Sequence, residues 1–566
     1  MKKNDPFQSL HITRYNRKPL TVLRSYSLTV FFLSAFFLLP SLAWADNLYY
    51  EIKQENSVSQ IQTDLQTVIN NATDGDNVVV TGSKTDADIM LVLNIPAKKT
   101  VLWEATYQSS PGVEIYDLIF FHGEGTFDVA GGTITTANAH AIHAVGKGSV
   151  VIVSGNGKVQ TSGTVVQSTE EEVHAIFTYG NVEIKDNAQV SGNAGEVIAS
   201  FGDNAIVSVS GGSITTFSGN AIVTYGKNSK IYISGGYLCN DAINTYPTVI
   251  AYDPTPSSEA LVHVSGDAVI RAKGDGCAII SSGSVYVGGN AQVSNNTGGN
   301  DPYMAAVRAS NIVEISDNAT ISASKNYVIA CNNRIIVKAN SKILAKNNAI
   351  AIFNYGQGQT QANVEVKDKA QIIAENNYAI SHNVPYYIFK IDGGVVFAYG
   401  NKIHHVINNE NFMAPTGLGI VLAWDKDAGN TNYEMFSTDD IFKLPESATA
   451  YWDKKEGKHG ISYANGENTG FIPIDNVNVL SINENNLPEI LVYPNPTSGE
   501  LRIETSDMRY EILEIEIYDM IGRKFISNLK SQISNQTIDI SKFSNGIYLV
   551  KIETEKGTLA KKIIKK

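Results

Sequence analysis

A short phrase of the form V-x-V, followed by a turn and a further apolar residue, recurs through the middle of the chain. Copies include Val151–Val153, Val207–Val209, Val262–Val264 and Val364–Val366. The second apolar residue of the phrase falls at positions 129, 153, 184, 209, 233, 264, 287, 315, 337, 366 and 391. The step between copies averages about 26 residues, and a fixed period of this length indicates a solenoid.

A second phrase precedes the first in most copies and joins an apolar pair to an aromatic residue and Gly, as in 174–180, 220–226 and 348–356. Each repeat then holds about three short strands, whose alternation directs one side chain inward and the next outward. Gly and Asn are suited to the positive-φ corners between strands. We therefore predict an all-β chain whose body is a right-handed parallel β-helix of about eleven coils.

The two ends of the coils differ from the repeats. Residues 61–69 have helical spacing and precede a strand at 78–80, which predicts an N-terminal cap. This arrangement resembles the pectin-lyase-like β-helix family over about residues 60–410, a likeness that implies architecture more than activity. We assign 46–125 to the cap and first coils, 126–411 to the regular coils, and 412–487 to irregular last coils, a cap and a linker. Trp424 and Trp452 are read as cap core, with a sugar-stacking platform as the alternative.

The first 45 residues have the order of a secretory signal peptide. A basic region precedes the apolar stretch Leu28–Leu39, and Ala43 and Ala45 form a small-x-small cleavage site. The competing interpretation is a membrane anchor, but the apolar run is shorter than the roughly 20 residues that span a bilayer.

Charge narrows the class of partner. Residues 1–45 carry six Lys or Arg and one acid, so the formal net charge of −12 becomes −17 once they are removed. Residues 488–566 hold 12 basic and 11 acidic side chains, which leaves about −18 on residues 46–487. A body this acidic repels phosphate, so nucleic acid is excluded as a partner.

Five phrases stand out in the last 80 residues: 492–499, 517–523, 538–541, 544–551 and the basic end 561–566. In their order and spacing they resemble the type IX secretion C-terminal sorting domain of the Bacteroidetes. Read from the residues alone, the stretch predicts a small β-sandwich over 488–566, because alternating short strands are broken by Pro, Asn and Gly. The motif positions are Tyr493, Pro494, Asn495, Pro496, Gly499, Tyr518, Asp519, Gly522, Arg523, Gly546 and Tyr548.

That resemblance implies export through the periplasm and recognition by the type IX translocon and its sorting machinery. It also implies removal of the domain on passage, and then either release or attachment to lipopolysaccharide, so the protein is expected outside the cell or on the outer-membrane surface.

Candidate chemical sites are sparse. Gly274–Cys277 includes Asp275 and resembles a phrase of polygalacturonase-type hydrolases, but the second carboxylate that glycoside hydrolysis needs is missing. Asp275 is therefore a candidate catalytic residue. The alternative is that this phrase occupies an ordinary position in the repeat. Cys239, Cys277 and Cys331 are an odd set with no C-x-x-C pair, which suits small buried residues better than disulfides.

Two further groups could bind metal. His140 and His174 occupy equivalent repeat positions and are expected to stack, while His143 allows a metal site if a neighbouring coil supplies a carboxylate. Asp425, Asp427 and Asn430 have the acidic density of a calcium loop, although Gly and Asn are reversed relative to the usual spacing. Calcium is the one cofactor that the residues suggest.

Three functions stay open for the body. The first is binding or adhesion toward glycans or host surfaces, because a long acidic solenoid presents repeated outward polar positions. The second is a polysaccharide lyase or hydrolase, by analogy of fold. The third is a structural surface protein, which would self-associate.

Overall fold

A computed structural model describes residues 47–163, 172–193, 195–241, 245–255, 258–295, 304–347, 350–354, 363–382, 388–400, 406–408, 419–425, 448–455, 458–466, 468–473, 490–493, 495, 497–505, 512–519, 524–529, 535–554 and 557–566. The predicted signal peptide, with Ala43 and Ala45, lies outside these residues. The described chain divides into two compact units, one formed by residues up to 207 with 211–213, the other by 208–210 and 214–566.

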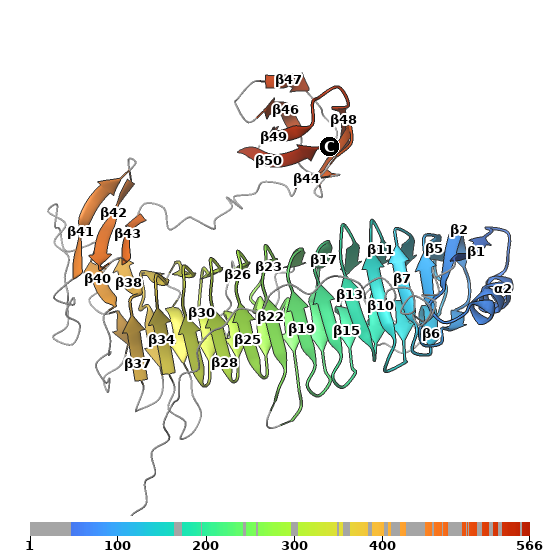
Figure 1. The fold of residues 1–566 in the computed structure, drawn as a ribbon, viewed down its shortest axis with the longest axis horizontal. Coiled ribbons are helices and arrows are strands. Elements are labelled where there is room, and N and C mark those ends of the chain that lie inside the picture. The colour runs from blue at the N-terminus through green and yellow to red at the C-terminus, as the bar shows by residue number, and fades with distance from the viewer. Residues whose placement is uncertain are drawn as a thin grey trace, which may run out of the picture. The chain divides into compact units, whose positions relative to one another are not determined.

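The predicted all-β fold and parallel solenoid are confirmed. Each turn contributes one strand to each of three parallel sheets, which we call sheets A, B and C, and strands of successive turns lie side by side (Figure 1). There are about 12 turns. The sequence count of about eleven begins at residue 129, whereas β2 (Asn77–Ala87) and β4 (Thr100–Trp103) already pair in parallel ahead of β7 (Thr126–Ala130).

The strands of the first unit follow the chain through the three sheets. Sheet A has β1 (Asn47–Ile52), β2 (Asn77–Ala87), β4, β7 (Thr126–Ala130), β10 (Val150–Ser154) and β13 (Asn181–Ile184). Sheet B has the end of β2, then β5 (Thr106–Ser109), β8 (Thr133–Thr136), β11 (Lys158–Thr161) and β14 (Gln189–Gly192). Sheet C has β3 (Leu91–Asn94), β6 (Asp117–His122), β9 (His140–Ala144), β12 (Ile176–Thr178) and β15 (Gly195–Ser200).

The strands β16 (Ile206–Val209) and β17 (Ser213–Thr216) contain residues of both units. In the second unit, sheet A has β19 (Lys230–Ile233), β22 (Leu261–Val264), β25 (Ser284–Val287), β28 (Ile312–Ile315), β31 (Arg334–Val337), β34 (Asn363–Lys367) and β37 (Ile388–Asp392). Sheet B has β20 (Tyr237–Asn240), β23 (Val269–Ala272), β26 (Gln292–Asn295), β29 (Thr320–Ala323), β32 (Lys342–Ala345), β35 (Gln371–Glu375), β38 (Val395–Gly400) and β40 (Ile420–Asp425). Sheet C has β18 (Gly219–Thr224), β21 (Val249–Ala251), β24 (Ile279–Ser281), β27 (Ala305–Ala309), β30 (Tyr327–Cys331), β33 (Ile350–Asn354), β36 (Ile380–His382) and β39 (Ile407–Asn408).

The repeat anchors define the register of sheet A. Val264 pairs with Val287, Val287 with Ile315, and Ile315 with Val337, so the anchors form one buried ladder. Because side chains alternate along a strand, a slip of one residue would turn every anchor toward solvent. The periodic apolar residues therefore select this pairing.

A helix covers the first strand of sheet C. Helix α2 (Val58–Asn71) is capped by Ser57, whose hydroxyl accepts a hydrogen bond from the Gln60 amide. The helix buries residues at helical spacing: Val58, Ile61, Leu65 and Ile69. The side chain of Gln62 accepts a hydrogen bond from the Val92 amide at 2.9 Å, and that of Gln66 accepts one from the Asn94 amide at 2.8 Å. These bonds occupy the unpaired edge of β3, as a solenoid cap must. Among the described residues, no helix is long and apolar enough to cross a membrane.

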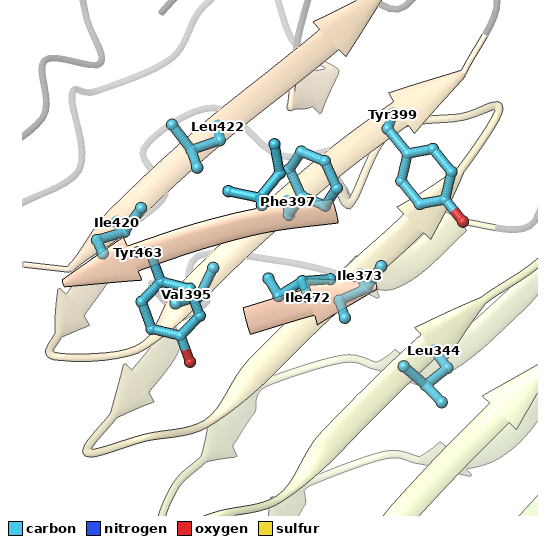
Figure 2. Close-up of a cluster of buried hydrophobic side chains, with 10 residues drawn as sticks. Leu344, Ile373, Val395, Phe397, Tyr399, Ile420, Leu422, Tyr463 and Ile472 are labelled. Carbon is cyan, nitrogen blue, oxygen red and sulfur yellow. The ribbon is translucent and has the colours of Figure 1, made fainter. Parts of the chain in front are cut away.

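A three-stranded antiparallel sheet, β41 (Ala448–Lys455), β42 (Lys458–Asn465) and β43 (Asn468–Pro473), packs on the last turns of sheet B. Figure 2 shows Tyr463 and Ile472 among side chains of β38 and β40. The Tyr463 hydroxyl accepts a bond from Gln371 at 3.0 Å. The apolar outer residues of β38 and β40 are therefore shielded from water.

The C-terminal residues form two small antiparallel sheets around one core, which includes Ile503, Ile517 and Val550. One sheet contains β44 (Ile490–Tyr493), β45 (Glu500–Thr505) and β48 (Asn535–Asp539). The other contains β47 (Lys524–Leu529), β46 (Ile512–Asp519), β49 (Gly546–Thr554) and β50 (Gly557–Lys565), in that order.

Candidate functional site

Three histidines of the first unit come together on sheet C. The His140 and His174 rings stack with centroids 4.9 Å apart and planes 8° apart, which confirms the expected ladder. The neighbouring turn supplies a carboxylate, since both oxygens of Asp117 lie 3.0 Å from Nδ1 of His143. Phe177 packs edge-on against His143, at 4.6 Å. All three histidines are buried.

Burial determines the protonation of this cluster. Burial, with the nearby His174 and His143, lowers the pKa of His140 to about 3, so its ring is neutral at ordinary pH. Its Nδ1 accepts the His174 amide at 3.1 Å, which places the ring proton on Nε2. Burial also raises the pKa of Asp117, and the bond from His143 opposes that rise.

Asp117 and His143 form one carboxylate–imidazole pair. Within the part of the chain that the structure describes, no group of three or more His, Cys, Asp or Glu side chains is placed to hold a metal ion. The stacked rings of His140 and His174 pack against Phe177, a contact that stabilises neighbouring turns.

Among the residues that the structure describes, the other chemical candidates do not gather into one site. Asp275 is half-buried in the turn between β23 and β24, and its catalytic role stays a prediction. The adjacent Cys277 is buried, with Sγ 3.7 Å from Sδ of Met304. Of the calcium candidates, Asp425 ends β40, while Asp427 and Asn430 lie outside the described residues, so calcium also stays a prediction.

All three cysteines are buried, and none of them is in a disulfide. Burial raises the pKa of the Cys331 thiol to about 11, and burial beside Asp241 raises that of Cys239 further. Because the thiolate is the reactive form, these groups are poor nucleophiles.

A column of aromatic rings lies on the outer face of sheet A in the second unit. Tyr232, His263 and Tyr286 are in direct register on β19, β22 and β25. Their ring centroids are 6.1 and 6.4 Å apart. His263 is exposed and the two tyrosines are half-buried, while the residues on either side of each ring are core. These residues are the middle positions of apolar-x-apolar phrases, and that pattern predicts that they point outward without predicting which of them are neighbours.

The aromatic column continues into a charged pair on the following turns. Tyr286 is in register with Glu314, whose carboxylate lies 2.7 Å from Nζ of Lys338. Hydrogen bonding to Glu314 raises the pKa of Lys338, which keeps it charged. This outer face thus offers ring faces beside a carboxylate and an ammonium group.

The motif phrases at the C-terminus meet in space. The Asn495 side chain accepts the Ile564 amide at 2.8 Å and donates to the Lys562 carbonyl at 2.9 Å. Thr497 exchanges backbone bonds with the Ile564 carbonyl and the Lys566 amide. The opening phrase is therefore joined to the basic end of the chain, about 70 residues later.

Other motif residues support the same small domain. Tyr548 is buried and donates to the Ser544 carbonyl at 2.8 Å, and Gly499 accepts the Ile540 amide at 2.7 Å. Tyr518 donates to Glu516 at 2.9 Å. Gly546 begins β49, while Tyr493 and Asp519 are placed only as strand residues of β44 and β46. Pro494, Pro496, Gly522 and Arg523 lie outside the described residues.

Glu516, one residue before the phrase 517–523, lies at the centre of a charged cluster. It bonds Lys524 and Lys551, the latter at 2.9 Å, in addition to Tyr518. The hydrogen bond from Lys524, then those from Lys551 and Tyr518, lower the pKa of Glu516 to about 2. Lys524 and Lys551 lie on the two neighbouring strands, and Tyr518 lies two residues from Glu516 on the same strand. Sequence spacing alone therefore does not predict the cluster.

Comparison with known proteins identifies this part of the chain. Residues 491–566 match the secretion system C-terminal sorting domain. No curated protein matches the chain. The type IX sorting domain indicates export to the cell surface or extracellular space, and it implies interaction with the type IX secretion machinery.

Proposed function

We propose that the β-solenoid is a binding module for glycans, carried to the cell surface or the medium by the sorting domain. The observation that supports this most is the column of Tyr232, His263 and Tyr286 on the outer face of sheet A. Aromatic faces pack against the apolar faces of sugar rings, and neighbouring carboxylate and ammonium groups hydrogen-bond sugar hydroxyls.

The repeat makes this face suited to a polymer. Successive strands are about 4.8 Å apart, so equivalent side chains recur at a regular interval along sheet A. A ligand with its own regular repeat can then make the same contact on several turns, and such contacts reinforce one another. Host or plant polysaccharides have this property.

Removal of two rings tests the proposal. For the mature secreted protein with Tyr232→Ala and Tyr286→Ala, we expect glycan affinity to fall about 10- to 100-fold, because each stacked ring contributes roughly 1 kcal/mol or more. The measurement is retention on a glycan panel, followed by Kd for any glycan retained by the wild type.

The matched control is Tyr49→Ala, since Tyr49 is 70% exposed in β1 and lies outside the column. Equal binding by the wild type and the double variant would reject the column as the site. Release of oligosaccharide by the wild type would favour a lyase or hydrolase instead, and self-association without glycan retention would favour a structural role.

A further inference from the structure

The four-stranded sheet of the sorting domain has an apolar outer face. Along β49, Tyr548 and Val550 point into the core, whereas Ile547 and Leu549 are 37% and 40% exposed. On β50, Ile564 is 37% exposed and pairs directly with Ile547. These side chains therefore form one continuous patch, which we call the β49–β50 face.

The other sheet of the domain provides an internal comparison. Among the side chains that the structure describes on that sheet, the exposed ones are Glu500, Arg502, Thr537 and Asp539, all polar or charged, and Arg502 pairs with Thr537. A sheet with one solvated face normally alternates apolar and polar side chains in this way. The β49–β50 face departs from that pattern within the same small domain, and exposed apolar patches of this kind mark interaction surfaces.

Lysines border the apolar residues. Lys562 pairs with Leu549 on the same face, and Tyr518 pairs with Leu549 from the other side. Lys551 and Lys524 flank Glu516 on the neighbouring strands. Lys562, Lys551 and Lys524 outnumber Glu516 and Glu514, the described carboxylates on this side of β46, so the border carries a net positive charge that disfavours a second copy of the same face. The complementary partner is an apolar protein surface bordered by carboxylates.

We propose that the β49–β50 face docks the sorting domain onto such an acidic-bordered apolar surface in the secretion machinery. The interaction with the machinery itself follows from the domain's identity. The structure adds which face makes it: Ile547, Leu549 and Ile564 supply the buried contact, and Lys562 supplies the charge that orients it.

The test uses the full chain in a bacterium that has the type IX system. The variant Ile547→Ser, Leu549→Ser, Ile564→Ser should reduce the rate of appearance outside the cell by about tenfold or more, because it removes the apolar contacts at the centre of the proposed interface. Pulse-chase immunoblots of periplasm, surface and medium measure it. The control Arg502→Ser, Thr537→Ser removes exposed side chains from the opposite sheet and should be exported at the wild-type rate.

A charge variant keeps the test independent of folding. Lys562 is exposed, so Lys562→Glu should leave the domain folded yet lower the export rate, while Lys562→Arg should restore it. Hydrogen exchange of Ile515–Ile517 amides in periplasmic chains checks that the core is intact. Wild-type export of the triple variant or of Lys562→Glu would overturn the proposal, as would a wild-type dimer in sedimentation that the triple variant abolishes.

Discussion

Residues with positive φ recur at one position of the turn between sheets A and B. The position two residues after the repeat anchor is Gly in some turns, as at Gly155 and Gly289, and Asp in others, as at Asp317 and Asp368. The carboxylate of Asp317 accepts the Gly289 amide at 2.8 Å, and that of Asp368 accepts the Ala339 amide at 2.9 Å. Asp thus tolerates the left-handed conformation and joins its turn to the preceding one.

Ala339 occupies this position with φ of 58°, and it has neither the conformational freedom of Gly nor a carboxylate that could accept a hydrogen bond. A non-Gly residue in the left-handed region costs roughly 1 kcal/mol, so Ala339→Gly should stabilise the local turns by about that amount. Hydrogen exchange of the β31 and β34 amides in the full chain measures the change.

Asp317→Gly is the matched variant for Ala339→Gly, because it relieves the same φ but removes the carboxylate that bonds Gly289. It should give no gain, or a loss of about 1 kcal/mol. Equal stabilisation by the two variants would show that the carboxylate contributes nothing.

At the scale of an element, the outer positions of sheet B change character along the second unit. The residues in register are Ser294, Ser322, Leu344, Ile373, Phe397 and Leu422. The apolar members lie in the cluster with β42 and β43, so the sheet acquires a second apolar face where another sheet covers it. Periodicity predicts an outward position, but it does not say whether that position meets water.

Strand β46 carries a charged cluster whose contribution depends on pH. The pKa of Glu516 is about 2 in the folded domain and near the model-peptide value of 4.5 when unfolded. A lowered folded pKa stabilises the domain above about pH 4.5, and that contribution is lost as the pH falls toward 2. We expect amides of β46 and β49 to lose exchange protection across this range.

Glu516→Gln should remove this acid-dependent step, since the neutral side chain does not titrate. Glu500→Gln is the control, because Glu500 is 58% exposed beside Arg502 on the other sheet. Peptide-resolved hydrogen exchange between pH 5 and pH 2 follows both. An unchanged acid response in Glu516→Gln would assign the step to another group.

At the scale of the whole molecule, the body and the sorting domain are stabilised differently. The solenoid is built from turns that contact their neighbours, with α2 occupying one open edge, whereas the sorting domain closes by pairing its opening phrase with its last residues. This pairing brings together the two ends of an approximately 70-residue segment. The stability of the domain therefore depends on its terminal strand β50.

Removal of residues 488–566 separates export from folding. The truncated chain should fold as a solenoid but stay in the periplasm, because the type IX signal is absent. Cell fractionation with immunoblotting measures its location, and normal appearance outside the cell would contradict the assignment. Truncation of only Lys565–Lys566 should have a similar but smaller effect, through loss of the Thr497–Lys566 bond.

The solenoid, its register and the sorting domain follow from local patterns in the sequence. Val264, Val287 and Ile315 repeat with one period, and a ladder of buried side chains in parallel strands is the structure that such a period can form. The motif phrases around Asn495, Gly499 and Tyr548 identified the C-terminal domain because each carries a local turn or strand signal.

Local patterns do not predict which outward side chains share a surface. The Tyr232–His263–Tyr286 column, the Asp117–His143 pair and the β49–β50 face join residues that are distant along the chain. In each case the local pattern predicts that the side chain points out of the core. Its neighbours, however, depend on which strand lies beside it and on what covers that face of the sheet. Those facts arise from long-range pairing, which a single strand does not encode.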